Sequence, residues 1–158
     1  SEEDQGTIFK IYLPRAGETL QSASHKNIKD KMPIGSETIL LVEDDAQVRD
    51  LARQVLEGQG YKVFETENGQ EALQLADHYA DPIHLLLTDV VMPDMNGRAL
   101  AEQLLQTRPG LKAIFISGYT DETIAHHGVL EPGIVLLQKP FSPVGLARKV
   151  REILDESG

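Results

Sequence analysis

Short apolar runs alternate with amphipathic stretches along most of this chain, from Thr38 to the C-terminus. Each run is too short for a helix and is bounded by Gly, Pro, Asn or Asp, which is typical of strands buried on both faces. The predicted strands are Thr38–Glu43, Tyr61–Thr66, Leu85–Asp89, Leu111–Ser117 and Ile134–Gln138.

The stretches between these strands carry apolar residues at the spacing of a helix that buries one face. Most of them open with a residue whose side chain caps a helix. Helices are predicted from Ala46 to about Glu57 behind an Asp45 cap, from Asn68 to Tyr79, from Asn96 or Gly97 to just before Pro109, from Asp121 to Gly128, and from Ser142-Pro143 almost to the C-terminus.

Two of these helices show the apolar spacing most clearly. In the first helix the apolar positions are Val48, Leu51, Ala52, Val55 and Leu56. In the last helix we expect the inward positions to be Leu146, Val150, Ile153 and Leu154.

Five strands that alternate with five helices predict an α/β fold. Such alternation is typical of right-handed βαβ units, which build a parallel sheet covered by helices on both faces. We expect a doubly wound five-stranded sheet with the flavodoxin-like order 2-1-3-4-5.

The first 37 residues follow a different pattern. Thr7 to Leu13 has the composition of a strand and ends at Pro14, whereas Ala16 to Glu37 is polar and interrupted by Gly and Pro. A lone strand is not stable by itself, so Thr7 to Leu13 must pair with another element or remain unstructured. The predicted organisation is therefore a segment at 1–15 that contains a single strand, a linker at 16–37 and one domain at 38–158.

Composition narrows the classes of function. The 158 residues are 41% hydrophobic, contain no Cys and carry a net charge of −10. A chain with this much negative charge is not expected to bind nucleic acid, and it fits a divalent cation or a basic protein surface as partner. A role of the negative charge in solubility alone would explain most of the excess of acidic residues. There is no apolar run long enough to span a membrane and no signal peptide, so we expect no direct membrane contact and a cytoplasmic location, whether or not a parent protein is membrane-anchored.

Polar side chains lie at the carboxyl ends of four of the predicted strands. Glu43 ends the first strand and Asp44 follows it, Asp89 ends the third, Ser117 ends the fourth and Lys139 follows the fifth. The carboxyl ends of parallel strands meet at one edge, where ligands bind in open sheets. Singly, these residues could be helix caps, turn formers or exposed charges, but together they predict a site.

Three carboxylates at one edge need a compensating cation. Oxygen ligands without His or Cys select a hard ion such as Mg²⁺. We expect Asp44 and Asp89 to bind Mg²⁺ directly, Glu43 to act through water and the Val91 carbonyl to complete the shell. The ion and Lys139 could then neutralise a phosphoryl group on Asp89, because carboxylates can accept phosphoryl groups.

Four motifs carry a family resemblance: Leu-Leu-Val-Glu43-Asp44-Asp45, Thr88 to Gly97, Ser117-Gly-Tyr, and Lys139-Pro-Phe. Through them, Thr38 to Glu156 resembles the receiver domain of two-component response regulators. The resemblance implies a phosphorelay domain that takes a phosphoryl group from phosphohistidine and relays it or changes its binding surface.

The resemblance also implies a role for each site residue. Asp89 is the phosphoacceptor, Glu43 and Asp44 are the acidic pair, Ser117 is the switch hydroxyl and Lys139 is the family lysine. The Lys139-Pro140 bond is typically cis in this family, and the readout surface comprises the fourth helix, fifth strand and fifth helix.

One position departs from the family pattern. The family often has Tyr or Phe three residues before the lysine, where this chain has Leu136. The aromatic part of the switch is therefore in question, while displacement of Ser117 could still move the following loop. Tyr119 flanks the site and is a candidate gate, with an amphipathic surface ring as the alternative.

The N-terminal segment carries a second resemblance. Gln5 to Pro14 is similar to the last strand of a histidine kinase ATP-binding domain, although Asp4 stands where that family usually has Gly. Together with a start at Ser1 rather than Met, this indicates the C-terminal receiver of a hybrid sensor histidine kinase. We expect no kinase activity from the chain itself, because it contains none of the ATP-binding motifs.

Several functions compete with a relay receiver. A standalone shuttling regulator is the main alternative, and a degenerate scaffold is disfavoured by the complete motif set. A phosphohydrolase of the haloacid dehalogenase type would need a second Asp where Val91 stands. The expected partners are a histidine kinase dimerisation domain with its phosphohistidine and a histidine phosphotransfer domain, with a homodimer left open.

Overall fold

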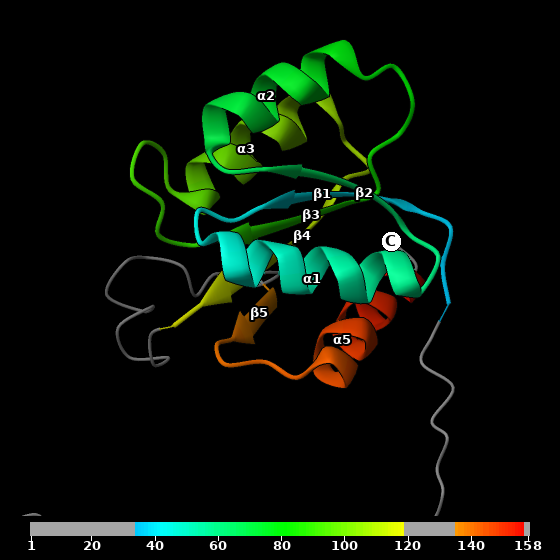
Figure 1. Ribbon diagram of the computed structural model, residues 1–158. Coiled ribbons are helices and arrows are strands. Elements are labelled where there is room, and N and C mark those ends of the chain that lie inside the picture. Colours follow the sequence, from blue (N-terminus) through cyan, green and yellow to red (C-terminus); the bar gives the residue numbers. More distant parts are fainter. Residues whose placement is uncertain (1–33, 119–134, 157–158) are drawn as a thin grey trace, which may run out of the picture. The chain divides into compact units, whose positions relative to one another are not determined.

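The five predicted strands form one parallel sheet in the order β2-β1-β3-β4-β5. This architecture comes from a computed structural model, which describes residues 34–118 and 135–156. The strands are β1 (Thr38–Val42), β2 (Lys62–Thr66), β3 (Leu85–Asp89), β4 (Lys112–Ser117) and β5 (Val135–Gln138). The predicted doubly wound order is therefore confirmed (Figure 1).

Four helices cover the sheet in the part of the chain that the structure describes. They are α1 (Ala46–Gly58), α2 (Gly69–His78), α3 (Gly97–Thr107) and α5 (Pro143–Asp155). Helices α1 and α5 lie on one face and α2 and α3 on the other (Figure 1). None of these helices is long and apolar enough to cross a membrane. The predicted helix from Asp121 to Gly128 lies outside the described residues, as do Thr7 to Leu13 and most of the predicted linker.

The helix caps follow the sequence prediction. Asp45 accepts hydrogen bonds from the backbone N–H groups of Gln47 and Val48, at 2.8 and 3.2 Å. The other three caps are Asn68, Asn96 and Ser142, and each accepts from the backbone N–H three residues later. Caps of this kind stabilise a helix by about 1 kcal/mol each, so these residues set where the helices begin.

Alternation along the central strands builds two cores. Leu40 and Leu86 pack towards α2 and α3, whereas Ile39, Leu41 and Leu87 pack towards α1 and α5. All five side chains are fully buried. Strands covered on both faces need apolar residues at every position, which explains the unbroken runs in the sequence.

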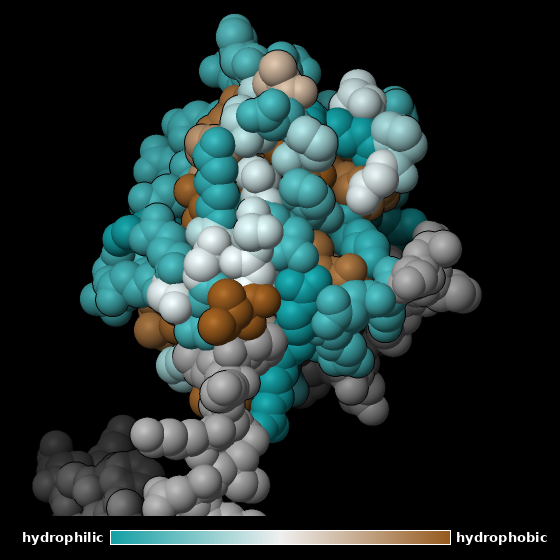
Figure 2. Space-filling model, turned by 90° about the vertical axis from the view of Figure 1, so that its right-hand side faces the viewer, coloured by the Kyte–Doolittle hydropathy of each residue, from teal (hydrophilic) through white to brown (hydrophobic). Residues whose placement is uncertain are grey.

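One helical position differs from the simple apolar pattern. Leu51 is spaced for the buried face of α1 but is 42% exposed, whereas Ala52 and Leu56 are buried. The large apolar side chains that are exposed in the described residues belong to separate elements: Ile34, Leu51, Val91, Leu105 and Val144. Figure 2 shows the side of the molecule at the amino ends of the strands. This side is mostly hydrophilic, with scattered apolar residues.

The last residues of the predicted linker contact the domain. The N–H of Gly35 donates to the carbonyl of Gln59 at 3.0 Å, and the N–H of Lys62 donates to the carbonyl of Glu37 at 3.0 Å. The Glu37 carboxylate forms an ion pair with Arg151 of α5 at 2.8 Å. The chain therefore reaches β1 along a docked segment, residues 34–37.

Candidate functional site

The site lies where the strand order reverses, between β1 and β3. Strand β1 pairs with β2 on one side and with β3 on the other, and Val42 is in register with Thr88. The residues that follow these positions, Glu43 and Asp89, therefore lie side by side at the carboxyl ends of the two strands. This reversal is where open α/β sheets bind ligands.

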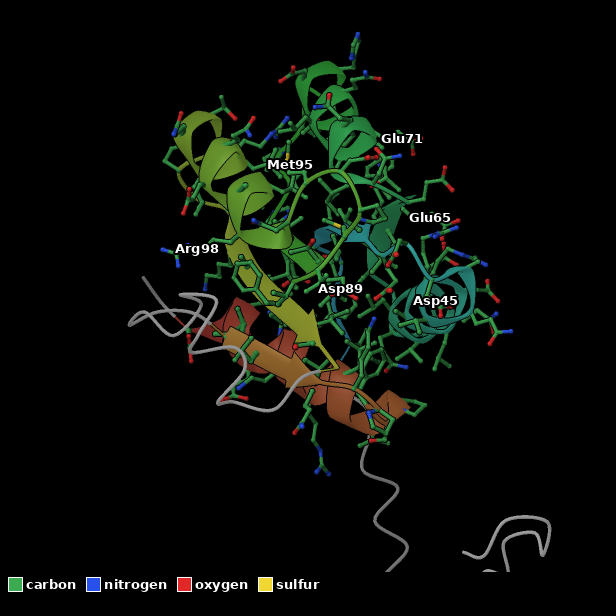
Figure 3. All side chains as sticks on the ribbon, turned by 90° about the vertical axis from the view of Figure 1, so that its left-hand side faces the viewer. Asp45, Glu65, Glu71, Asp89, Met95 and Arg98 are labelled. Atoms are coloured by element: carbon green, nitrogen blue, oxygen red, sulfur yellow. The ribbon has the colours of Figure 1, made fainter. Side chains whose placement is uncertain are left out.

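Three predicted carboxylates come together at this edge. One oxygen from each of Glu43, Asp44 and Asp89 lies within 4.8 Å of the others. Glu43 is fully buried and Asp89 is 9% exposed, whereas Asp44 is exposed. Figure 3 looks onto this edge, with Asp89 near its centre.

Lys139 brings a positive charge to the carboxylates from the end of β5. Its Nζ lies 2.7 Å from Oδ2 of Asp89 and 2.9 Å from Oε1 of Glu43. Its backbone N–H donates to the carbonyl of Ser117 at 2.7 Å, which ties the residue to the end of β4. The cis Lys139-Pro140 bond expected from the family resemblance is present.

The two oxygens of Asp89 have different partners. Oδ2 contacts Lys139, and Oδ1 accepts a hydrogen bond from the backbone N–H of Val91 at 2.8 Å. Val91 is two residues after Asp89 in the sequence and is 49% exposed. Both oxygens are thus oriented before any ligand arrives, which is the geometry that a positioned nucleophile needs.

Burial and charge act in opposite directions at this site. Burial raises the pKa of the Glu43 carboxyl, and the hydrogen bond from Lys139 only partly offsets this. Burial by itself would lower the pKa of Lys139, but the hydrogen bonds with Asp89 and Glu43 outweigh it and raise that pKa. Lys139 is therefore a fixed positive charge at neutral pH.

Ser117 ends β4 and is buried. Strand β4 pairs with β3 so that Asp89 is in register with Ile116, which places Ser117 at the same edge as Asp89. Leu136 is half-buried in β5 and packs against the core on the α2 and α3 side. Tyr119 lies outside the described residues.

Gly97 supports Asp89 in a way that the sequence analysis missed. A Cβ at this position would overlap the carbonyl oxygen of Asp89 and lie 2.9 Å from Cγ2 of Thr88. The N–H of Gly97 also donates to the carbonyl of Val90 at 3.1 Å. The Asn-Gly pair signals a turn in the sequence, but nothing in it signals this close approach to Asp89.

The donor set fits a hard divalent cation. The ligand atoms are all oxygens, and the charges of three carboxylates exceed that of one ammonium. Oε2 of Glu43 is buried and lies 2.7 Å from Nζ of Lys139 without the geometry of a hydrogen bond, so it retains acceptor capacity. Mg²⁺ characteristically combines one or two carboxylates with water.

Comparison with known proteins identifies the family. The family model described as the response regulator receiver domain matches residues 39–151. Sensor kinase CckA of Brucella abortus (strain 2308) is 37% identical over 163 aligned residues, which cover 99% of this chain and 17% of that protein. Response regulator receiver protein CpdR of the same strain is 34% identical over 116 residues, which cover 73% of this chain and 95% of CpdR.

Solved structures agree with this assignment. The receiver domain of the hybrid histidine kinase CckA has a TM-score of 0.60 and 36% identity, covering 75% of this chain and 99% of that one. A CheY-like receiver domain from Methanospirillum hungatei JF-1 has a TM-score of 0.67 and 33% identity, covering 77% of this chain and 96% of that one. Receiver domains generally bind Mg²⁺ at an acidic pocket, and this chain has an acidic cluster of Glu43, Asp44 and Asp89. The chain therefore belongs to the response regulator receiver domains of two-component signalling.

Proposed function

We propose that this domain accepts a phosphoryl group from phosphohistidine on Asp89, with Mg²⁺ as the cofactor. The observation that carries the proposal is the environment of the Asp89 carboxylate. One oxygen is held by the Lys139 ammonium and the other by the Val91 N–H, beside the acidic pair. A buried carboxylate in this setting is a positioned nucleophile with a cation in reach.

The transfer step balances without a further reactant. A carboxylate oxygen of Asp89 attacks the phosphorus, and the new P–O bond forms as the P–N bond to the imidazole breaks. The electron pair of the P–N bond returns to the imidazole nitrogen, and a proton on the other ring nitrogen makes the leaving group neutral. Catalysis consists of positioning and charge neutralisation, as in other phosphoryl transfers.

The residues at the edge divide this work. Asp44 and Asp89 would hold Mg²⁺, with Glu43 acting through water and the Val91 carbonyl completing the shell. Bound Mg²⁺ would neutralise charge on the phosphoryl oxygens. Lys139 would exchange its contact with Asp89 for a phosphoryl oxygen, and the Ser117 hydroxyl would donate a hydrogen bond to another.

We further infer that the domain is a receiver of a hybrid histidine kinase. The alignment with Sensor kinase CckA covers 99% of the chain, including the residues before β1, whereas the alignment with CpdR covers 73%. This favours residues 1–15 as the end of a kinase ATP-binding domain and 16–37 as a linker. The donor or acceptor is then a histidine kinase dimerisation domain or a histidine phosphotransfer domain in the cytoplasm, and a standalone shuttling regulator is the alternative.

Intact-mass spectrometry after incubation with acetyl phosphate tests the chemistry. We expect one phosphoryl adduct that requires Mg²⁺ and is absent from Asp89→Asn. Asp94→Asn is the matched control, because it makes the same change at an exposed position in the loop that follows Asp89. An adduct that persists in Asp89→Asn, or a wild type that binds Mg²⁺ but takes no phosphoryl group, would contradict the proposal.

A further inference from the structure

Arg49 occupies an unusual place for a cation. It lies in the first turns of α1, where its backbone N–H donates to the carbonyl of Asp45 at 2.9 Å. The amino end of a helix carries a partial positive charge and disfavours a nearby cation. A specific contact must therefore offset this cost.

The contact is with the backbone that carries the acidic pair. Nη1 of Arg49 donates to the carbonyl oxygen of Glu43 at 2.5 Å and lies 3.3 Å from that of Asp44. Side chains on a helix point towards its amino end, so the guanidinium reaches back over the loop between β1 and α1. One side chain thus contacts the backbone of both acidic residues.

Two other hydrogen bonds of the loop involve its N–H groups and not the two carbonyl groups that Arg49 contacts. The N–H of Glu43 donates to the carbonyl of Thr66, and the N–H of Asp45 donates to Oε1 of Glu43, both at 3.3 Å. These bonds use the N–H groups of the loop, whereas the Arg49 guanidinium donates to the carbonyl groups of Glu43 and Asp44.

Arg53, one turn later on α1, has different contacts. Its guanidinium pairs with Glu57 at 3.0 Å, with Glu65 at 3.4 Å and with Asp50. All three partners are carboxylates outside the acidic loop. The two arginines therefore share a helix and a charge, but only Arg49 contacts the loop.

We propose that Arg49 is the positioning residue for the acidic pair, holding the Glu43 and Asp44 backbone so that both carboxylates project towards Asp89. This inference rests on the proposed Mg²⁺-dependent receiver function. Three carboxylates within 4.8 Å repel one another, and the exposed Asp44 side chain could relieve this by turning to solvent. The guanidinium restrains the backbone from which the Asp44 side chain projects, and this limits how far its carboxylate can move away from the other two before the cation binds.

The first test is Mg²⁺ binding by calorimetry. Residues that orient metal ligands typically contribute ~10- to 100-fold in metal affinity, so we expect Arg49→Met to raise the Mg²⁺ dissociation constant by about tenfold or more. Arg53→Met removes the same charge from the same helix and should change the constant by less than about twofold. Equal effects of the two substitutions would overturn the proposal.

Arg49→Lys separates positioning from charge. An ammonium keeps the positive charge but lacks the planar fork of the guanidinium. If Arg49 acts by positioning, Arg49→Lys should weaken Mg²⁺ binding nearly as much as Arg49→Met. Affinity close to wild type in Arg49→Lys would mean that charge alone matters, and would overturn the positioning role.

A kinetic measurement separates this inference from the proposed function. The rate of adduct formation with acetyl phosphate should reach half its maximum at a higher Mg²⁺ concentration in Arg49→Met, with the maximum retained. Thermal unfolding at each Mg²⁺ concentration reports the folded fraction, so a folding defect is recognised separately. A wild type without any Asp89-dependent adduct would reject the function itself, whereas identical Mg²⁺ dependence in wild type and Arg49→Met would reject only the role of Arg49.

Discussion

The ammonium of Lys139 lies 2.7 Å from Oδ2 of Asp89, although Asp89 ends β3, Lys139 follows β5, and these two strands are not neighbours in the sheet. Strand β4 separates β3 from β5, and Lys139 reaches across its end, where its backbone N–H is held by Ser117. The same ammonium contacts Glu43 from β1. One cation thus joins the ends of three strands and holds together two carboxylates that would otherwise repel each other.

Lys139→Met should therefore lower the free energy of unfolding of the domain and make that free energy more dependent on Mg²⁺. Removing one partner of a buried ion pair leaves uncompensated charge, and we expect a loss of roughly 3 kcal/mol in the free energy of unfolding at pH 7. Added Mg²⁺ should recover part of that loss, because it replaces the missing positive charge. Urea unfolding with and without Mg²⁺ measures both effects.

Lys149→Met is the matched control for that substitution. Lys149 forms an exposed pair with Glu152 at 3.2 Å, and such pairs contribute little. We expect a change of at most about 1 kcal/mol and no recovery with Mg²⁺. Similar losses in the two variants would argue against Lys139 as the charge that balances the site.

The docked segment 34–37 should add a pH-dependent contribution to stability. The hydrogen bond from Arg151 holds the pKa of Glu37 below its ordinary value of 4.5. A depressed pKa in the folded state stabilises the protein above the unfolded pKa, and this stabilisation is lost as the pH falls through the folded pKa. The difference in unfolding free energy between wild type and Glu37→Gln should therefore be constant above about pH 5.5 and shrink below pH 4.5.

Urea unfolding across that pH range measures this difference. Glu102→Gln is a suitable control, because Glu102 forms an exposed pair with Arg98 on a single helix. A difference for Glu37→Gln that grows as the pH falls would contradict the predicted sign.

Glycines at two positions should respond oppositely to alanine. A Cβ at Gly97 would meet the backbone of Asp89, whereas a Cβ at Gly58, the last residue of α1, would meet nothing within 4 Å. Overpacking costs about 1–3 kcal/mol, so Gly97→Ala should lower the free energy of unfolding by that amount and reduce the yield of the Asp89 adduct. Gly58→Ala should raise stability by about 0.5–1 kcal/mol with the adduct unchanged. Unfolding curves and intact mass would check both, and a stable, reactive Gly97→Ala would show that the Asp89 loop tolerates the extra methyl group.

Gly35 offers a test of how firmly the docked segment is held. A Cβ there would overlap the ring of Tyr61, so Gly35→Ala should displace residues 34–37 from the domain. The amide of Lys62, which donates to the carbonyl of Glu37, should then exchange its hydrogen faster, on the order of tenfold. Gly110→Ala is the control, because its Cβ would meet nothing within 4 Å, and equal exchange rates in both variants would show that the segment is held without Gly35.

The secondary structure and the position of the site were predictable because their signals are local. Apolar runs and helical spacing report burial over a few residues, and Asp45, Asn68, Asn96 and Ser142 cap helices through bonds to residues nearby in the chain. Strict alternation of strands and helices then leaves few topologies, so the edge that collects Glu43, Asp44 and Asp89 followed from the order of elements.

The contacts that organise the site arise from packing between distant segments. Lys139 contacts Glu43 and Asp89, and Gly97 lies close to the backbone of Asp89, only once the strands are assembled. Arg49 and Glu37 look like ordinary surface charges in the sequence, and Leu51 looks like a core residue, because helical spacing does not say which neighbours cover a side chain. Propensity and capping are properties of short segments, whereas ion pairs and close backbone approaches between distant residues depend on where the folded sheet brings them together.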